Sequence, residues 1–140
     1  QALVLGTHTH PVTISAAEDL TRILFALNER AEIRSTLQTL RLSNIPLNSI
    51  KKWEAMPDRK VVGEILSSAC YLPESFTAAL YFAWKYSDDF SLAVLANAKV
   101  GGDNCHRGVV VGSVVGMQTG IPRKWLHDLV AMDGLRCDTS

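Results

Sequence analysis

Apolar residues recur three or four positions apart along most of the chain, which is the spacing of a helix face that packs against a core. The stretches with this spacing are residues 14–27, 31–42, 47–56, 74–86 and 88–100, and a last one runs from 122 to about 134. Residues 61–69 fit neither the helical spacing nor the alternation of a strand clearly. No alternation of period two lasts long enough to predict a strand. The pattern therefore predicts an all-α fold.

Another helix is expected over residues 109–117, which are valines, glycines, one serine and one methionine. Each glycine inside a helix costs about 1 kcal/mol relative to alanine. Glycines fall four apart here, on one helical face, at Gly108, Gly112, Gly116 and Gly120. We therefore expect a second backbone to approach that face closely. A loose glycine-rich loop is the alternative.

The chemistry-bearing residues lie directly before this helix, in the run Gly101-Gly102-Asp103-Asn104-Cys105-His106. Asp103 stands at a helix start, where a carboxylate accepts amide hydrogens or faces a cation. A helix cap alone is the simplest alternative. Zinc held by Asp103, Cys105 and His106 is another, because sulfur and imidazole suit that metal. A nucleophilic Cys105–His106 pair is disfavoured, because neighbours on a helix cannot face each other.

Other candidates have a structural interpretation beside the functional one. The guanidinium of Arg107 could bind a phosphate or carboxylate, or serve the fold. Asp88 and Asp89 stand at a helix start and are expected to stabilise it. The tryptophans fall among apolar residues, so we expect them in the core rather than stacked on an adenine; they are Trp53, Trp84 and Trp125.

The composition narrows the class of protein. Lys and Arg total 14 and Asp and Glu also total 14. The sequence therefore has no excess of basic residues of the kind that binds nucleic acid or an anionic membrane. No apolar run approaches the length of a membrane span. The cysteines number three and cannot all pair within the chain, which favours a reduced, cytoplasmic setting.

Several segments together resemble a known family. Gly101-Gly102-Asp103, the small-residue helix, Gly120-Ile121-Pro122 and Trp125-Leu126 resemble the C-terminal signature of ADP-ribosylglycohydrolases. Gly6-Thr7-His8 and residues 69–80 are similar to earlier segments of that family, in the same order. The resemblance implies a compact, multi-helix orthogonal bundle. It also implies hydrolysis, with magnesium, of the N- or O-glycosidic bond that joins ADP-ribose to a protein. It assigns Asp103 to the metal and His8, Gly101 and Gly102 to the ligand.

The chain departs from the family pattern Gly-Gly-Asp-x-Asp-Thr, because Cys105 and His106 stand where further metal ligands belong. Sulfur and imidazole are poor ligands for magnesium. A catalytically eroded protein that binds ADP-ribose, or a structural, crystallin-like member, is therefore the alternative. No segment resembles the family's N-terminal half. Residues 1–140 are thus predicted to be one domain or the C-terminal half of a larger one, with an exposed apolar face for that half or a protein partner.

Overall fold

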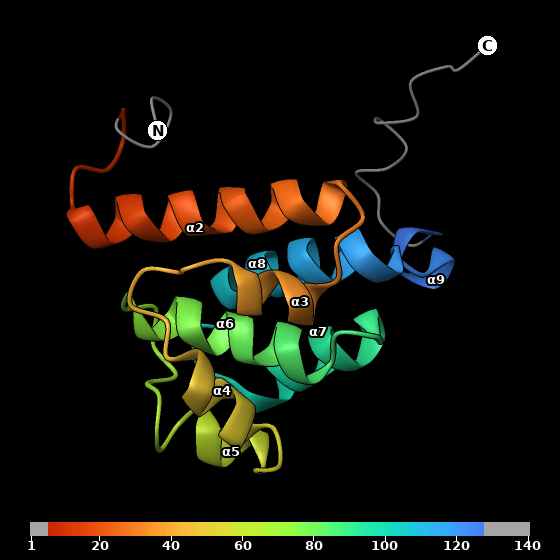
Figure 1. The fold of residues 1–140 in the computed structure, drawn as a ribbon. Coiled ribbons are helices and arrows are strands. Elements are labelled where there is room, and N and C mark those ends of the chain that lie inside the picture. The colour runs from red at the N-terminus through yellow and green to blue at the C-terminus, as the bar shows by residue number, and fades with distance from the viewer. Residues whose placement is uncertain (1–5, 128–140) are drawn as a thin grey trace.

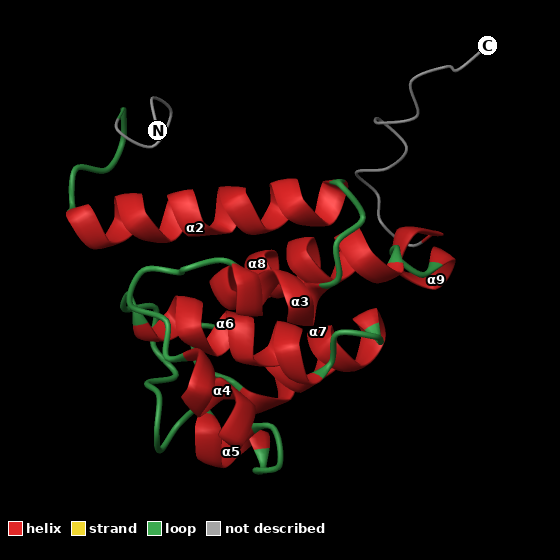
Figure 2. Cartoon of the chain, in the orientation of Figure 1, coloured by secondary structure: helices red, strands yellow, loops and turns green. Residues whose placement is uncertain are grey.

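The computed structural model describes residues 6–127 of the chain, and these residues form helices joined by short loops (Figures 1 and 2). The elements are α2 (Pro11–Asn28), α3 (Ile33–Thr39), α4 (Leu47–Trp53), α5 (Asp58–Val61), α6 (Glu74–Lys85), α7 (Phe90–Val100), α8 (Asn104–Thr119) and α9 (Arg123–His127). Within residues 6–127, β pairing is limited to one isolated bridge between Val62 and Leu66. The predicted all-α helical bundle is confirmed.

The observed helices follow the predicted stretches closely, with differences at short elements. The helix predicted at residues 31–42 is shorter in the structure, where it runs only from Ile33 to Thr39. The sequence predicts no helix at α5, which forms directly after Pro57 and places Asp58 in its first turn, where a carboxylate suits the helix dipole. Asp89 caps α7 by accepting from the backbone N–H of Leu92 at 2.9 Å, as expected. The predicted last helix begins as α9, and its continuation lies outside the described residues.

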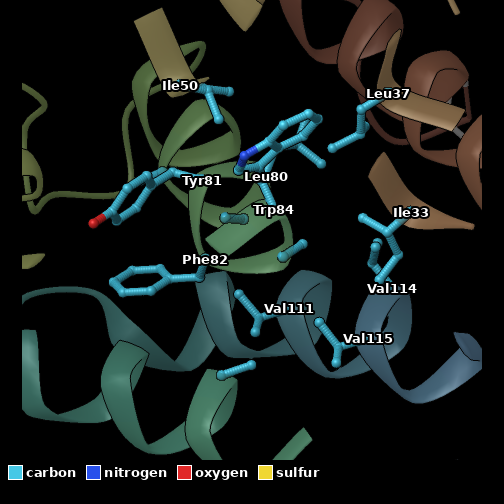
Figure 3. Packing of buried hydrophobic residues seen from close by; sticks show 14 of the residues in the cluster. Ile33, Leu37, Ile50, Leu80, Tyr81, Phe82, Trp84, Val111, Val114 and Val115 are labelled. Carbon is cyan, nitrogen blue, oxygen red and sulfur yellow. The ribbon is translucent and has the colours of Figure 1, made fainter. Parts of the chain in front are cut away.

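Helix α8 is central to the bundle and packs against α2, α6 and α7. Figure 3 shows Val111 and Val115 of α8 pointing toward α6, in the same cluster as Ile33 and Leu37 of α3. In α6, every residue of 76–84 is buried. A helix that is apolar around its whole circumference lies inside the protein. This packing fixes the N-terminus of α8, and therefore the Asp103 segment, relative to α6 and α7.

The tryptophans belong to the core, as predicted. Trp84 is buried, and its indole N–H donates to Glu54 Oε2 at 2.8 Å. Trp125 packs edge-on against Phe90, with ring centroids 5.8 Å apart. Trp53 is partly buried against the same cluster. The indole rings are therefore used in packing.

Within residues 6–127, the nearest atoms to the glycines of α8 belong to side chains and not to a neighbouring backbone, so that prediction is wrong for the described part of the chain. A methyl group on Gly112 would meet no described atom within 4 Å. On Gly108 it would meet the side-chain nitrogen of Asn97 at 3.3 Å, and on Gly116 the side chains of Ile121 and Phe90. The spacing identified a shared face correctly, but side chains or open space lie across it.

The outer side of α8 is partly apolar. Val109 is 67% exposed and Met117 is 43% exposed, one turn on either side of Ser113. A partner for an exposed apolar face stays a prediction. No helix in the described range 6–127 combines the length and apolar character needed to cross a membrane.

Gln118, near the end of α8, joins segments that are distant in sequence. Its Oε1 accepts from the backbone N–H of Ile33 at 2.6 Å, across 85 positions of chain. Its Nε2 donates to the carbonyl of Ser87 at 3.1 Å and to Asp88 Oδ1 at 3.2 Å. One amide side chain thus caps the start of α3 and holds the loop between α6 and α7.

A polar cluster around Asp58 joins α5 to α6. Asp58 Oδ1 accepts from Lys85 Nζ at 2.8 Å and from the Tyr81 hydroxyl at 2.7 Å, and Oδ2 accepts from the Tyr86 hydroxyl at 2.8 Å. Lys85 also donates to the Met56 carbonyl at 2.7 Å. Burial by itself would raise the pKa of Asp58, but these hydrogen bonds outweigh it and hold that pKa below its ordinary value. Burial, together with the hydrogen bond to the Asp58 carboxylate, raises the pKa of Tyr86 to about 12.

The lowered pKa of Asp58 predicts a loss of stability in acid. Because the folded pKa lies below the ordinary value of 3.8, this carboxylate contributes fully above about pH 5. That contribution disappears as the pH falls through the folded pKa. We expect Asp58→Asn to cost about 2 kcal/mol at pH 7 and progressively less as the pH falls below about 4. Urea unfolding of the wild type and of Asp58→Asn at several pH values measures the difference in their free energies of unfolding. A difference that does not change with pH would contradict the prediction.

Candidate site at the start of α8

The turn before α8 requires glycine at both positions. Gly101 and Gly102 have φ values of +80° and +65°, in the region that side chains disfavour. A methyl group on Gly102 would lie 2.3 Å from the carbonyl oxygen of Ser68. That same oxygen accepts from the backbone N–H of Asp103 at 2.9 Å. The close backbone approach in this protein is therefore at Gly102, and it sets the position of Asp103.

Asp103 occupies the N-cap position of α8, yet its carboxylate makes no capping hydrogen bond to the first turn. Instead Asp103 Oδ1 accepts from His106 Nδ1 at 2.7 Å. This hydrogen bond lowers the pKa of Asp103. The Asp103 side chain is 23% exposed and that of His106 is 84% exposed. The carboxylate of Asp103 is therefore engaged with an imidazole at the start of the helix.

Arg107 is buried and supports the turn, in agreement with the structural interpretation. Its Nε donates to Asn97 Oδ1 at 2.9 Å, Nη1 to the Ser68 carbonyl at 3.0 Å, and Nη2 to the Gly101 carbonyl at 2.7 Å. Burial lowers the pKa of its guanidinium, and the nearby Asp103 opposes that effect. The side chain is only 2% exposed. It connects α7, α8 and the loop before α6.

A pocket of about 440 Å³ opens beside Asp103. Its lining combines polar and apolar side chains from the N-terminal loop, the start of α6 and the start of α8: His8, Cys70, Leu72, Ser75, Phe76, Asp103, His106, Arg107 and Val110. His8 and Asp103 are thus brought together, although 95 positions separate them. Gly101 and Gly102 lie next to Asp103 but outside this lining, and a ligand contact there stays a prediction.

Sequence reasoning missed part of this site. Cys70, Ser75 and Phe76 line the pocket, and their segment carries part of the family resemblance without an assigned role. Asn97 was missed entirely. It is 2% exposed, binds Arg107, and donates to the carbonyl of Asn104 at 2.8 Å. Its signal in the sequence is an amide within an otherwise mainly apolar helix.

The donors next to Asp103 do not fit magnesium. That ion requires oxygen ligands in octahedral order. The neighbouring side chains offer the thiol of Cys105, which contacts Asn104 Oδ1 at 3.6 Å, and the imidazole of His106, which already binds the carboxylate. Nor do any three His, Cys, Asp or Glu side chains in residues 6–127 come close enough together to hold a metal, so the zinc alternative has no ligand set there.

The family model of ADP-ribosylglycohydrolase matches residues 2–138, which include every segment that lines the pocket. No curated protein and no solved structure matches the chain. The match extends over nearly the whole sequence, and it agrees with the helical bundle described above. The chain therefore belongs to the ADP-ribosylglycohydrolase family.

Proposed function

We propose that this protein binds the ADP-ribose group of an ADP-ribosylated protein in the pocket at the start of α8. The observation that carries the proposal is the convergence of His8 and Asp103, two positions named by the family resemblance, on one pocket. Its volume lies within the range of small-molecule sites, and its lining includes the apolar side chains of Leu72 and Phe76. Apolar walls with a few convergent polar groups suit a sugar or nucleotide ligand.

Each polar group has a role that its chemistry supports. The carboxylate of Asp103 can accept hydrogen bonds from ribose hydroxyls, because an ionised carboxylate accepts and does not donate. His8 is exposed and hydrogen-bonded to the Thr7 hydroxyl at 2.8 Å. It would contact the ligand from the N-terminal loop. Arg107 holds the turn that presents Asp103 and acts through that position.

Titration calorimetry with ADP-ribose tests the proposal. We expect saturable binding by the wild type and a loss of about tenfold or more in Ser75→Trp, whose indole would fill the pocket. Glu64→Trp is the matched control, because Glu64 is exposed and outside the lining. Its affinity should equal that of the wild type. Absence of saturable heat from the wild type, or equal affinities for both variants, would contradict the proposal.

Hydrolysis of the glycosidic bond is the second candidate, and family membership is the observation that favours it. The magnesium-dependent form of this reaction, which the resemblance implies, is not supported by the donors at positions 103, 105 and 106. Release of free ADP-ribose from an ADP-ribosylated protein, followed by chromatography, separates hydrolysis from binding alone. A hydrolase would turn over many substrate molecules per protein chain.

A further inference from the structure

The carboxylate of Asp103 already has a partner that can supply positive charge. His106 lies three positions along the helix, where side chains meet, and its Nδ1 is 2.7 Å from Asp103 Oδ1. A carboxylate gains most from a hydrogen bond when the donor is itself charged. A cation bound at this oxygen would compete with the imidazole for the negative charge of the carboxylate.

The other side chains of the first turn are committed as well. Asn104 Nδ2 donates to the Ala98 carbonyl at 3.3 Å, and Asn104 Oδ1 accepts from the Cys105 thiol at 3.6 Å. The amide of Asn104 is therefore occupied on both sides. The thiol of Cys105 is a soft donor that selects copper, zinc or iron rather than magnesium. Besides Asp103, the hard side-chain oxygen of the first turn is therefore Oδ1 of Asn104, which already contacts the thiol.

We propose that His106 takes the place of a divalent cation as the partner of the Asp103 carboxylate, so that ligand binding in this pocket does not depend on magnesium. The inference rests on the proposed function for its ligand, ADP-ribose. Its metal part is independent of that ligand. His106 is a positioning residue in this account, because it acts by holding Asp103.

A magnesium titration with no nucleotide present tests the metal part. The wild type is expected to give no saturable heat at millimolar magnesium. The double variant Cys105→Asp with His106→Thr restores hard oxygen at both positions, and an acid in the first turn also suits the helix dipole. It should bind magnesium at least about tenfold more tightly than the wild type.

The matched control is Cys105→Asn with His106→Thr, which removes the imidazole but adds no charge, and its magnesium affinity should lie between those of the wild type and the Cys105→Asp, His106→Thr variant. Far-ultraviolet circular dichroism checks that all three proteins keep their helices. Saturable magnesium binding by the wild type that Asp103→Asn abolishes would overturn the inference. Failure of the Cys105→Asp, His106→Thr variant to bind magnesium more tightly would also overturn it, because Cys105 and His106 would then not be what prevents magnesium binding.

ADP-ribose binding with magnesium or with a chelator present tests the ligand part. Wild-type affinities in the two buffers should agree within about twofold, whereas the Cys105→Asp, His106→Thr variant should become magnesium-dependent. Wild-type binding that is lost in the chelator would overturn the inference. No binding of ADP-ribose in either buffer would instead refute the proposed function, and the magnesium titration alone would still decide the metal part.

Discussion

Arg107→Met is expected to lower the free energy of unfolding by about 3 kcal/mol. Methionine fills much of the buried volume but leaves the carbonyl oxygens of Ser68 and Gly101, and the amide oxygen of Asn97, without their donor. A buried acceptor that loses its partner costs about 1 to 3 kcal/mol, and release of the buried charge offsets part of the total. Urea unfolding followed by circular dichroism measures the change.

Arg123→Met is the control for this substitution, because Arg123 is exposed at the start of α9. Its effect should stay within about 0.5 kcal/mol. A loss below about 1 kcal/mol in Arg107→Met would show that the guanidinium does not hold the turn, and that the Gly101 and Ser68 carbonyls find water instead.

Gly102→Ala should also cost about 3 kcal/mol, for a different reason. The new methyl group would lie 2.3 Å from the carbonyl oxygen of Ser68, at a residue whose φ is +65°. Because the obstacle is backbone, relief requires the loop or the turn to move. That movement would break the 2.9 Å hydrogen bond from Asp103 to Ser68 and alter the pocket.

Alanine substitutions at two other glycines, in the same unfolding experiment, separate the cost of a positive φ from the cost of the contact with Ser68. Gly101→Ala carries a positive φ of +80° but no neighbour within 4 Å, so it should cost only about 1 to 2 kcal/mol. Gly112→Ala lies in ordinary helix with open space and should gain about 0.5 to 1 kcal/mol. Equal losses at Gly101 and Gly102 would mean that the contact with Ser68 is unimportant.

The helices could be predicted because burial imposes a period that the sequence records directly. Ile23 and Leu27 of α2, which lie four apart and are both buried, are an example. The sequence has no comparable pattern that identifies which residues pack against a given helix face. Gly108 and Gly112 share a face in the sequence, yet Gly108 faces the side chain of Asn97, whereas no atom of residues 6–127 lies within 4 Å of a methyl group placed on Gly112. Periodicity predicts which residues point together, but tertiary packing decides what they meet.

The candidate site could be predicted only in part. The family resemblance indicated Asp103 and His8, and the fold brings both to one pocket. The pairing of Asp103 with His106 follows from their spacing of three on a helix, which favours side-chain contact. The burial of Arg107 could not be derived, because its acceptors are two backbone carbonyls and an amide whose positions depend on the loop at Ser68.

The contact of Gln118 with the backbone N–H of Ile33 has a consequence for local fluctuations. A seven-residue helix such as α3 would ordinarily fray from its ends, because its first amides have no acceptor within the helix. Here one of those amides bonds to a side chain of α8, and the same side chain holds Ser87. Unwinding of the start of α3 therefore breaks a bond to the last turn of α8, and this shared side chain couples local opening of the two segments.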